Sequence, residues 1–245
     1  MSTFAQSLAT ALQLITSLDP ALWRIVGRSL AVSASACLLA CAAGLVLGAW
    51  LGVLRFAGRD ALLAVLNTLL AVPSVVVGLV VYLLLSRSGP LGFLGWLFSF
   101  QAMVLAQCLL VLPVATALTR QVVDDAERAH GEQLQSLGAR SGLRSLLLAW
   151  DERYALLTVL IATFGRAVSE VGAVMVVGGN IEGFTRVMTT AIALETSKGD
   201  LALALALGLV LLAVVLLLNA AIALLRRWRE RVEGRGRALV AGVAL

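Results

Sequence analysis

Four long stretches of the sequence contain no charged residue, and they limit the structures that the chain can form. Residues 29–54 and 61–86 are each 26 residues long, and residues 88–119 and 201–225 have the same character. As a helix, 26 residues rise roughly 39 Å, which exceeds the thickness of a bilayer core of about 30 Å. Because the mean hydropathy of the whole chain is +0.98, we predict an all-α integral membrane protein with several spans.

The apolar pattern predicts five transmembrane helices, the fourth of which is interrupted by charge. They lie at about residues 26–54, 61–86, 92–119, 154–179 and 201–225. Arg166 and Glu170 are the charged residues of the fourth span. Pro73 and Pro113 each remove a backbone hydrogen bond, so we expect kinks in the second and third spans.

Both ends of the chain lie outside this transmembrane domain, which we place at residues 23–225. Residues 1–22 carry apolar side chains at near-helical spacing among polar ones, which predicts an amphipathic helix in the membrane interface. Asp19 and Pro20 are typical of a cap and a first-turn proline for the next helix. Residues 226–245 carry six arginines and form a basic tail, which we expect to bind anionic lipid.

The distribution of basic residues predicts the orientation of the chain. Thirteen basic residues lie in the turn at residues 55–60, the charged block at residues 120–153 and the tail. The opposite side has five, which are Arg24, Arg28, Arg87, Arg186 and Lys198. Because cytoplasmic loops are enriched in Lys and Arg, we expect the N-terminus outside and the C-terminus in the cytoplasm. Membrane anchoring thus accounts for the net charge of +5, and we expect no nucleic acid partner.

The sequence contains no recognisable catalytic or metal-binding constellation. His130 is the only histidine, and no glycine-rich loop ends in Gly-Lys-Ser or Gly-Lys-Thr. Cys37, Cys41 and Cys108 lie inside apolar runs, where their spacing fits neither a disulfide framework nor a zinc site. We therefore expect no catalytic residue, metal or cofactor. If this protein performs active transport with ATP, another chain must hydrolyse the ATP.

Three glycines in the first span are spaced for close helix packing. Gly44, Gly48 and Gly52 recur every four residues, so on a helix they form one smooth stripe. A neighbouring helix can approach such a stripe closely. We therefore expect it to be a packing surface.

Arg166 and Glu170 share one face of a helix, about 6 Å apart along its axis. Charges inside a membrane are costly and require a partner or water. Two interpretations stay open. Arg166 lies beside an anion pathway and is held there by Glu170, or the two form a neutralised pair that locks this helix to a neighbour.

A glycine-rich turn follows this pair. Gly178, Gly179 and Asn180 would allow a helix to end at membrane depth, where free backbone N–H groups can bind an oxyanion. The polar side chains that could extend such a pathway are Thr185, Arg186, Thr189 and Thr190. The alternative interpretation is an ordinary helix-loop-helix turn on the outer surface.

The charged block at residues 120–153 contains two short predicted helices around a joint at Gly138. Leucines mark both helices, with Leu134 and Leu137 in the first and Leu143, Leu146 and Leu147 in the second. A cytoplasmic helix pair with an exposed apolar ridge and charged flanks is suited to docking into a groove on a soluble partner. A solvated linker would explain the charges but not the repeated leucines.

At this block the chain resembles the permease subunits of bacterial ABC importers. That family carries Glu-Ala-Ala, three residues, Gly, nine residues, and then Ile-x-Leu-Pro in its last large cytoplasmic loop. Glu132 and Gly138 match this motif at the right spacing, and Leu148 takes the place of the isoleucine. The departures are Gln133 and Leu134 in place of both alanines, and Trp150 and Asp151 in place of Leu-Pro.

Two further segments resemble tungstate-type ABC permeases, which are related to the molybdate and sulfate permeases. They are AVPSVVVGLVVYLLLSRSGPLG, residues 71–92, and GRAVSEVGAVMVVGGNIEGFTRVMTTAIALETSKGD, residues 165–200. The resemblance covers most of the chain, from about Arg24 to Asn219. It implies a permease of the molybdate/methionine-type fold in the bacterial inner membrane, with five transmembrane helices and a cytoplasmic coupling-helix loop.

The resemblance also implies partners and roles. A homodimer of permeases would enclose the pathway, two cytoplasmic ATP-binding subunits would dock on residues 120–153, and an external oxyanion-binding protein would deliver the substrate. The ATPase-coupling residues would be Glu132, Leu134, Leu137, Gly138, Ala139, Arg140 and Leu143. We expect a tetrahedral oxyanion as the substrate, with tungstate ahead of molybdate or sulfate.

The rival interpretations are a membrane enzyme and a channel that acts alone. An enzyme requires a nucleophile, a metal or an acid–base pair, and the sequence offers none. A lone channel has no need of a leucine-ridged cytoplasmic helix pair. Co-purification of a nucleotide-binding subunit separates the importer from both rivals.

Overall fold

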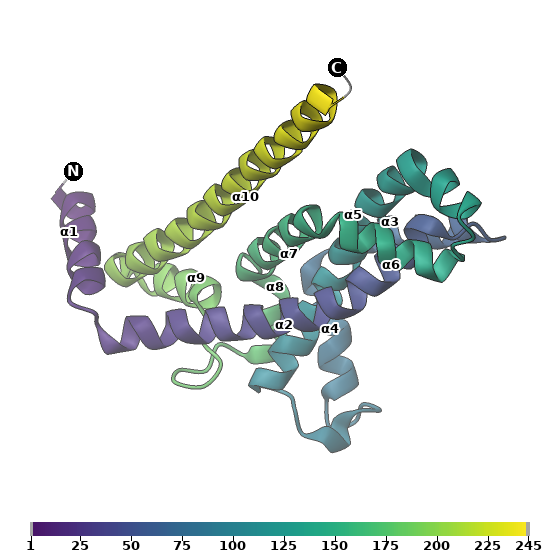
Figure 1. Ribbon diagram of the computed structural model, residues 1–245. Coiled ribbons are helices and arrows are strands. Elements are labelled where there is room, and N and C mark those ends of the chain that lie inside the picture. The colour runs from purple at the N-terminus through teal and green to yellow at the C-terminus, as the bar shows by residue number, and fades with distance from the viewer. Residues whose placement is uncertain (1, 244–245) are drawn as a thin grey trace.

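The structure is a computed structural model that describes the backbone of residues 2–243 and the side chains of residues 5–225, 227 and 228. This part of the chain is helical and contains no strand (Figure 1). The helices are α1 (Ser2–Thr16), α2 (Pro20–Val53), α3 (Arg59–Ala71), α4 (Ser74–Leu85), the 3₁₀ helix η1 (Gly92–Leu94), α5 (Phe100–Ser136), α6 (Ser141–Asp151), α7 (Arg153–Val168), α8 (Gly172–Gly178), α9 (Met188–Lys198) and α10 (Leu201–Val243).

The junction between α1 and α2 is built on Asp19. Its Oδ1 accepts hydrogen bonds from the backbone N–H groups of Ala21 (3.0 Å) and Leu22 (2.9 Å), and Pro20 is the first residue of α2. The predicted cap and first-turn proline are confirmed. α1 ends at Thr16, so it is shorter than the predicted N-terminal segment of residues 1–22. It packs against α10. Its placement in the membrane interface stays a prediction.

The contact between α2 and α5 is the most extensive helix–helix contact of the described chain. The stripe of Gly44, Gly48 and Gly52 lies in this contact. A Cβ atom at Gly48 would lie 2.6 Å from the carbonyl oxygen of Thr116, closer than carbon and oxygen can approach. The two backbones are therefore as close as glycine alone permits.

The order of contacts along the helices establishes their directions. Gly44, Gly48 and Gly52 meet Ala115, Thr119 and Val123 in that order, so α2 and α5 run parallel. α7 is antiparallel to α5, because Ala167 meets Gln107 whereas the earlier Leu160 packs near the later Ala115. α10 is antiparallel to α7, because Gly165 lies beside Leu218 and Tyr154 beside Trp228.

Two of the predicted spans are broken helices. α3 and α4 meet at Pro73 with a bend of 97°, and α7 and α8 meet with a bend of 57°. The kink expected at Pro73 is in fact a break, since the residue before a proline disfavours helical geometry and Val72 is extended. By contrast, α5 continues as one helix through Pro113, and the kink expected there stays a prediction.

Three helical segments of the described chain are long and apolar enough to cross a membrane by themselves: Pro20–Val53, Phe100–Ser136 and Leu201–Leu225. The number rises to five when each bent pair counts as one span. Five spans are therefore compatible with the described chain. The third begins at Phe100, because η1 and turns occupy most of the preceding segment that was predicted to belong to it.

The first of the two short helices predicted around Gly138 is not a separate helix. It is the end of α5, whose 37 residues rise roughly 55 Å. Since a bilayer core is about 30 Å thick, this helix extends well beyond a membrane. α6 is the second predicted helix. The charged block is thus the end of a long helix, a joint and one short helix.

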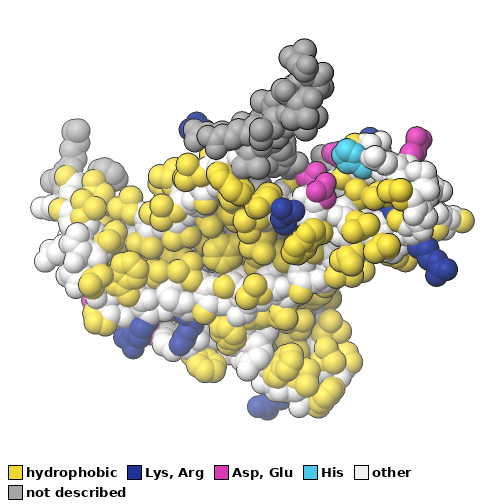
Figure 2. All heavy atoms as spheres, in the orientation of Figure 1, with side chains coloured by type: hydrophobic (Ala, Val, Ile, Leu, Met, Phe, Trp, Pro, Cys, Tyr) yellow, Lys and Arg dark blue, Asp and Glu magenta, His cyan; other side chains and the backbone are white. Residues whose placement is uncertain are grey.

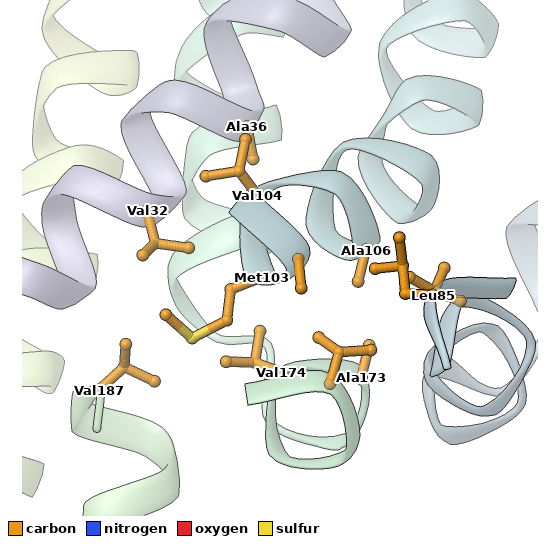
Figure 3. Packing of buried hydrophobic residues seen from close by; sticks show 12 residues of the cluster. Val32, Ala36, Leu85, Met103, Val104, Ala106, Ala173, Val174 and Val187 are labelled. Carbon is orange, nitrogen blue, oxygen red and sulfur yellow. The ribbon is translucent and has the colours of Figure 1, made fainter. Parts of the chain in front are cut away.

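The largest buried cluster of the described residues joins α2, α4, α5 and α8. Val32 and Ala36 of α2 face Met103 of α5, Val174 of α8 and Val187 near the start of α9 (Figure 3). Figure 2 shows hydrophobic side chains over most of the visible face, with charged ones mainly along its lower edge and at the upper right. The side chains of Arg226 and of residues 229–245 lie outside the described part, so lipid binding by the tail stays a prediction.

Candidate functional site

The joint between α5 and α6 is made by Gly138. Its φ of +82° is in the left-handed region, where a side chain would be strained. The N–H of Gly138 donates to the carbonyl of Gln135, and the N–H of Ala139 donates to the carbonyl of Leu134, so the last carbonyls of α5 are satisfied. Arg140 then precedes the first turn of α6 in extended geometry. The predicted turn role of Gly138 thus has a conformational basis.

α6 has one face against the molecule and one face open. Ser145 and Leu148 are buried, and Leu148 packs with residues of α2 and α5. The exposed large apolar residues of α6 are Leu143, Leu146, Leu147 and Trp150. Their spacing of three and four residues forms one stripe on the helix. Leu137, at the end of α5, is also exposed, whereas Leu134 is half-buried in the Leu148 cluster.

A buried ion pair fixes α6 to α5. Arg144 Nη2 lies 3.0 Å from Glu127 Oε1, and the two side chains are 14% and 13% exposed. Glu127 Oε2 and Arg144 Nε are buried and have no hydrogen-bond partner in the described structure. The contact between Nη2 and Oε1 is therefore the one that neutralises both side chains. Loss of either partner would leave a buried charge uncompensated.

A second carboxylate ties the start of α3 to α5. Asp124 is buried, and its Oδ1 lies 2.8 Å from Arg55 Nη2 and 3.5 Å from Arg59 Nη2. Its Oδ2 lies 2.7 Å from Arg128 Nη2. Three guanidinium groups thus surround one carboxylate at the base of the coupling element, which we define as residues 124–151. These contacts hold the turn after α2 against the point where α5 leaves the apolar part of the molecule.

Arg166 and Glu170 form the predicted pair across the break between α7 and α8. Arg166 Nη1 lies 3.1 Å from Glu170 Oε2, and the side chains are 47% and 4% exposed. Glu170 Oε1 also accepts a hydrogen bond from Ala173 N, and its backbone carbonyl accepts one from Thr189 Oγ1 (2.7 Å). Glu170 therefore stabilises the junction and positions Arg166. The pair is compatible with both interpretations, which stay open.

The segment between α8 and α9 is closed by its own hydrogen bonds. α8 ends at Gly178, and Gly179 and Asn180 have φ of +67° and +50°. Thr185 Oγ1 donates to Gly178 O and accepts from Ile181 N. One of the two interpretations of this turn requires free amides. The amides of residues 179, 181, 185, 186 and 187 donate within the protein in this conformation, and both interpretations stay open.

The remaining predicted pathway residues are also bonded internally. Thr190 Oγ1 lies 2.9 Å from Asn180 Oδ1, and Asn180 Nδ2 donates to Thr190 O (3.2 Å). Arg186 Nη1 lies 3.5 Å from Glu195 Oε1, and Glu195 also pairs with Lys198 at 3.2 Å. Thr185, Thr189 and Thr190 are buried.

The structure divides the predicted residues into two groups. The pathway residues gather where α7, α8 and the start of α9 meet, and the coupling residues lie at the end formed by α5 and α6. Figure 2 shows acidic, basic and histidine side chains at the upper right, the position of α5 and α6 in Figure 1. Glu132 and Arg140 are exposed there. The polar end at α5 and α6 is thus separate from the polar junction at α7, α8 and the start of α9.

Several polar residues of both regions were not predicted. Gln107 is buried in α5, and its Nε2 donates to Ala167 O at the end of α7, while its Oε1 has no described partner. A polar residue within an apolar run could have indicated it. The i,i+4 spacing of Asp124 and Arg128 is also visible in the sequence. The pair of Glu127 and Arg144 spans the joint and carries no such local signal.

Comparison with known proteins identifies similar transport proteins. Residues 44–231 match the family described as "Binding-protein-dependent transport system inner membrane component". The chain is 42% identical to the tungstate uptake system permease protein TupB of Peptoclostridium acidaminophilum, over 91% of this chain and 97% of the relative. It is 43% identical to a probable anion ABC transporter permease protein of Haloferax volcanii, over 86% and 92%. The sulfate transport system permease protein CysW of Escherichia coli is 36% identical over 57% and 51%.

Proposed function

Because the chain belongs to the family of binding-protein-dependent transport system inner membrane components, we propose that it is the permease subunit of an ATP-driven importer for tungstate. The family implies partner ATP-binding subunits and a substrate-binding protein. Tungstate is proposed because a tungstate uptake permease matches nearly the whole chain. Sulfate and molybdate share its tetrahedral shape and charge, and sulfate permeases are more distant relatives over a shorter part of the chain.

The observation that carries the importer function is the exposed stripe on α6. Leu143, Leu146, Leu147 and Trp150 lie open on a helix that a buried ion pair clamps to α5. Exposure of an apolar stripe to water is unfavourable in free energy, and a partner that covers the stripe removes that cost. A stand-alone channel or a membrane enzyme has no use for this arrangement. We infer that the stripe docks into a groove of an ATP-binding subunit.

The assembly that we propose contains two copies of the permease, two ATP-binding subunits and one external binding protein. ATP binding would bring the two ATP-binding subunits together and move the docked α6 helices. Arg144 and Gly138 would transmit this movement to α5, which carries it toward the junction of α7 and α8. The pathway itself would pass Arg166, because its guanidinium is half exposed and held by Glu170.

We further propose that the N-terminus lies outside the cell and the C-terminus in the cytoplasm. The parallel directions of α2 and α5, and the antiparallel direction of α7, support an alternation of five crossings. The broken pair of α3 and α4 would return the chain between α2 and α5. The coupling element then lies on the side with most basic residues, as the positive-inside rule requires.

The proposed function is tested with the complete complex in proteoliposomes. ATP hydrolysis and uptake are measured with the binding protein present and with tungstate, molybdate or sulfate as the only oxyanion. We expect tungstate to stimulate ATP hydrolysis most strongly and to accumulate inside. Stimulation by sulfate or molybdate but not tungstate would show that the substrate is wrong. If no ATP-binding subunit co-purifies with the permease, the importer function itself is wrong.

A further inference from the structure

A small pocket with three arginines lies between the first part of α2 and the segment that joins α8 to α9. Its volume is about 180 Å³, and Arg24 and Arg28 of α2 and Arg186 of the joining segment line it. Glu182 lines it as well. Figure 2 shows basic side chains beneath the first half of α2, as it is oriented in Figure 1. This pocket lies toward the end of α2 opposite the coupling element, which packs near Gly52.

Arg186 is a largely buried member of the pocket lining. Its side chain is 11% exposed, and its Nη1 lies 3.5 Å from Glu195 Oε1. Its Nε is buried and has no hydrogen-bond partner in the described structure. An arginine that is this buried and only partly bonded retains the capacity to donate to a further acceptor.

The residues that line the pocket carry more positive than negative charge, although Glu195, which is not among them, pairs with Arg186. Three guanidinium groups line it and repel one another, and Glu182 is the carboxylate among the lining residues. The Glu182 side chain is 84% exposed, and its Oε2 lies 3.7 Å from Arg186 Nη1, so solvent weakens their attraction. Arg24 Nε donates to Pro20 O, which orients that side chain and leaves its other N–H groups available. A small anion in the pocket would relieve the repulsion.

We propose that this pocket binds one tetrahedral oxyanion dianion before it passes through the permease. Guanidinium groups donate paired hydrogen bonds to oxyanions, and several of them around one cavity suit a compact dianion. The volume corresponds to about six water molecules at roughly 30 Å³ each, which is enough space for a central atom with four oxygens. This proposal rests on the proposed function in two respects, which are the identity of the anion and the position of the pocket on the outer side of the membrane.

A second ligand with the same chemistry would be an acidic side chain of the binding protein. The geometry favours the free anion, because the pocket is small and the Arg186 side chain that lines it has little exposed surface. Glu182 competes weakly with the anion for the Arg186 guanidinium. The pocket therefore predicts opposite effects for two substitutions: loss of arginine charge weakens oxyanion binding, and loss of the Glu182 charge strengthens it.

The test uses the permease with its ATP-binding subunits in lipid nanodiscs, without the binding protein. Tungstate binding is measured by equilibrium dialysis with elemental quantification. We expect the double substitution Arg24→Gln/Arg28→Gln to weaken binding about tenfold or more, because it removes two of the three guanidinium groups that can donate charged hydrogen bonds to the anion. Glu182→Gln is expected to tighten binding severalfold. Arg87→Gln removes one arginine charge from an exposed turn on the same predicted side, and it should leave the tungstate affinity unchanged.

Three results separate the possibilities. Unchanged tungstate affinity in the double variant would overturn the pocket, even if the wild-type complex imports tungstate. A second measurement adds the binding protein to the same nanodiscs and records its association. Loss of that association with unchanged tungstate affinity would also overturn the pocket and assign the arginines to protein docking. Failure of the wild-type complex to import tungstate would instead contradict the proposed function, whatever the dialysis shows.

Discussion

At the scale of single residues, the contact between α2 and α5 depends on the absence of side chains at three positions. Gly48 is the tightest of them, because a Cβ atom there would collide with backbone of α5 as well as with Thr119. A backbone atom cannot rotate away as a side-chain tip can. The two helices would have to separate along their length to admit even one methyl group.

We therefore expect Gly48→Ala to destabilise the protein by about 1–3 kcal/mol, as overpacking of a tight contact does. The measurement is thermal unfolding of the purified protein in detergent. Gly27→Ala is the matched control, since Gly27 lies in the same helix and no atom would lie within 4 Å of the added Cβ atom. That substitution should be neutral or slightly stabilising, because alanine favours helix. Equal stability of both variants would contradict the packing role of the stripe.

The Glu127 and Arg144 pair predicts a non-additive response. Arg144→Met leaves the Glu127 carboxylate buried without a cation, whereas Glu127→Leu/Arg144→Met leaves no buried charge. We expect the single variant to lose several-fold more transport per ATP hydrolysed than the double variant. Asp125→Asn, an exposed neighbour on α5, serves as the control.

Transport and ATP hydrolysis are measured together in proteoliposomes for these variants. A structural defect alone would lower both rates and the yield of the complex, but it would leave their ratio intact. A single variant that keeps the wild-type ratio would show that this ion pair does not position α6 for coupling.

Local spacing explains which residue contacts were predictable. Arg166 and Glu170 are one helical turn apart, so their pairing follows from the sequence once a helix is assumed. The contact between Glu127 and Arg144 depends on the direction in which the chain continues from Gly138 into α6. No local sequence pattern predicts that direction. For the same reason, the pocket that unites Arg28 with Arg186 was not predicted, although both residues were counted on the same side.

At the scale of elements, the coupling element contains two glycines with different requirements. Neither Gly138 nor Gly142 has an atom within 4 Å of an added Cβ, so space does not distinguish them. Gly138 has φ of +82°, whereas Gly142 lies in the first turn of α6 without a positive φ. The two positions therefore separate backbone conformation from packing.

We expect Gly138→Ala to strain the joint by about 1–2 kcal/mol and to reduce ATPase stimulation by the loaded binding protein. Gly142→Ala should preserve this stimulation, because alanine is a better helix former than glycine. Substrate-stimulated ATP hydrolysis of the reconstituted complex provides the measurement. The joint does not require its left-handed geometry if the two variants behave alike.

The elements were predicted best where the sequence pattern is long. The apolar runs located α2, α5 and the first part of α10, and the cap at Asp19 located the start of α2 to within a few residues. Composition alone could not separate a kink from a break, so Pro73 and Pro113 were treated alike. Neighbouring helices decide whether a helix continues through a proline, and such contacts lie far apart in sequence.

At the scale of the whole molecule, the directions of α2, α5, α7 and α10 lead to a prediction about topology. Single cysteines at Arg87 and at Leu137 should lie on opposite sides of the membrane, in a background with the three native cysteines replaced. A membrane-impermeant maleimide applied to intact cells should label position 87 and leave position 137 unlabelled until the cells are opened. Labelling of position 137 in intact cells would reverse the proposed orientation.

The unbroken course of α5 has a mechanical consequence. One rod carries Gln107 beside the end of α7 and Glu127 beside α6, and its backbone hydrogen bonds leave it little freedom to shorten. A rod of roughly 55 Å that pivots by about 5° displaces its far tip by about 5 Å. In the proposed importer, we therefore expect α5 to act as a lever that converts a small tilt of the docked coupling element into a displacement of several ångströms at its far end.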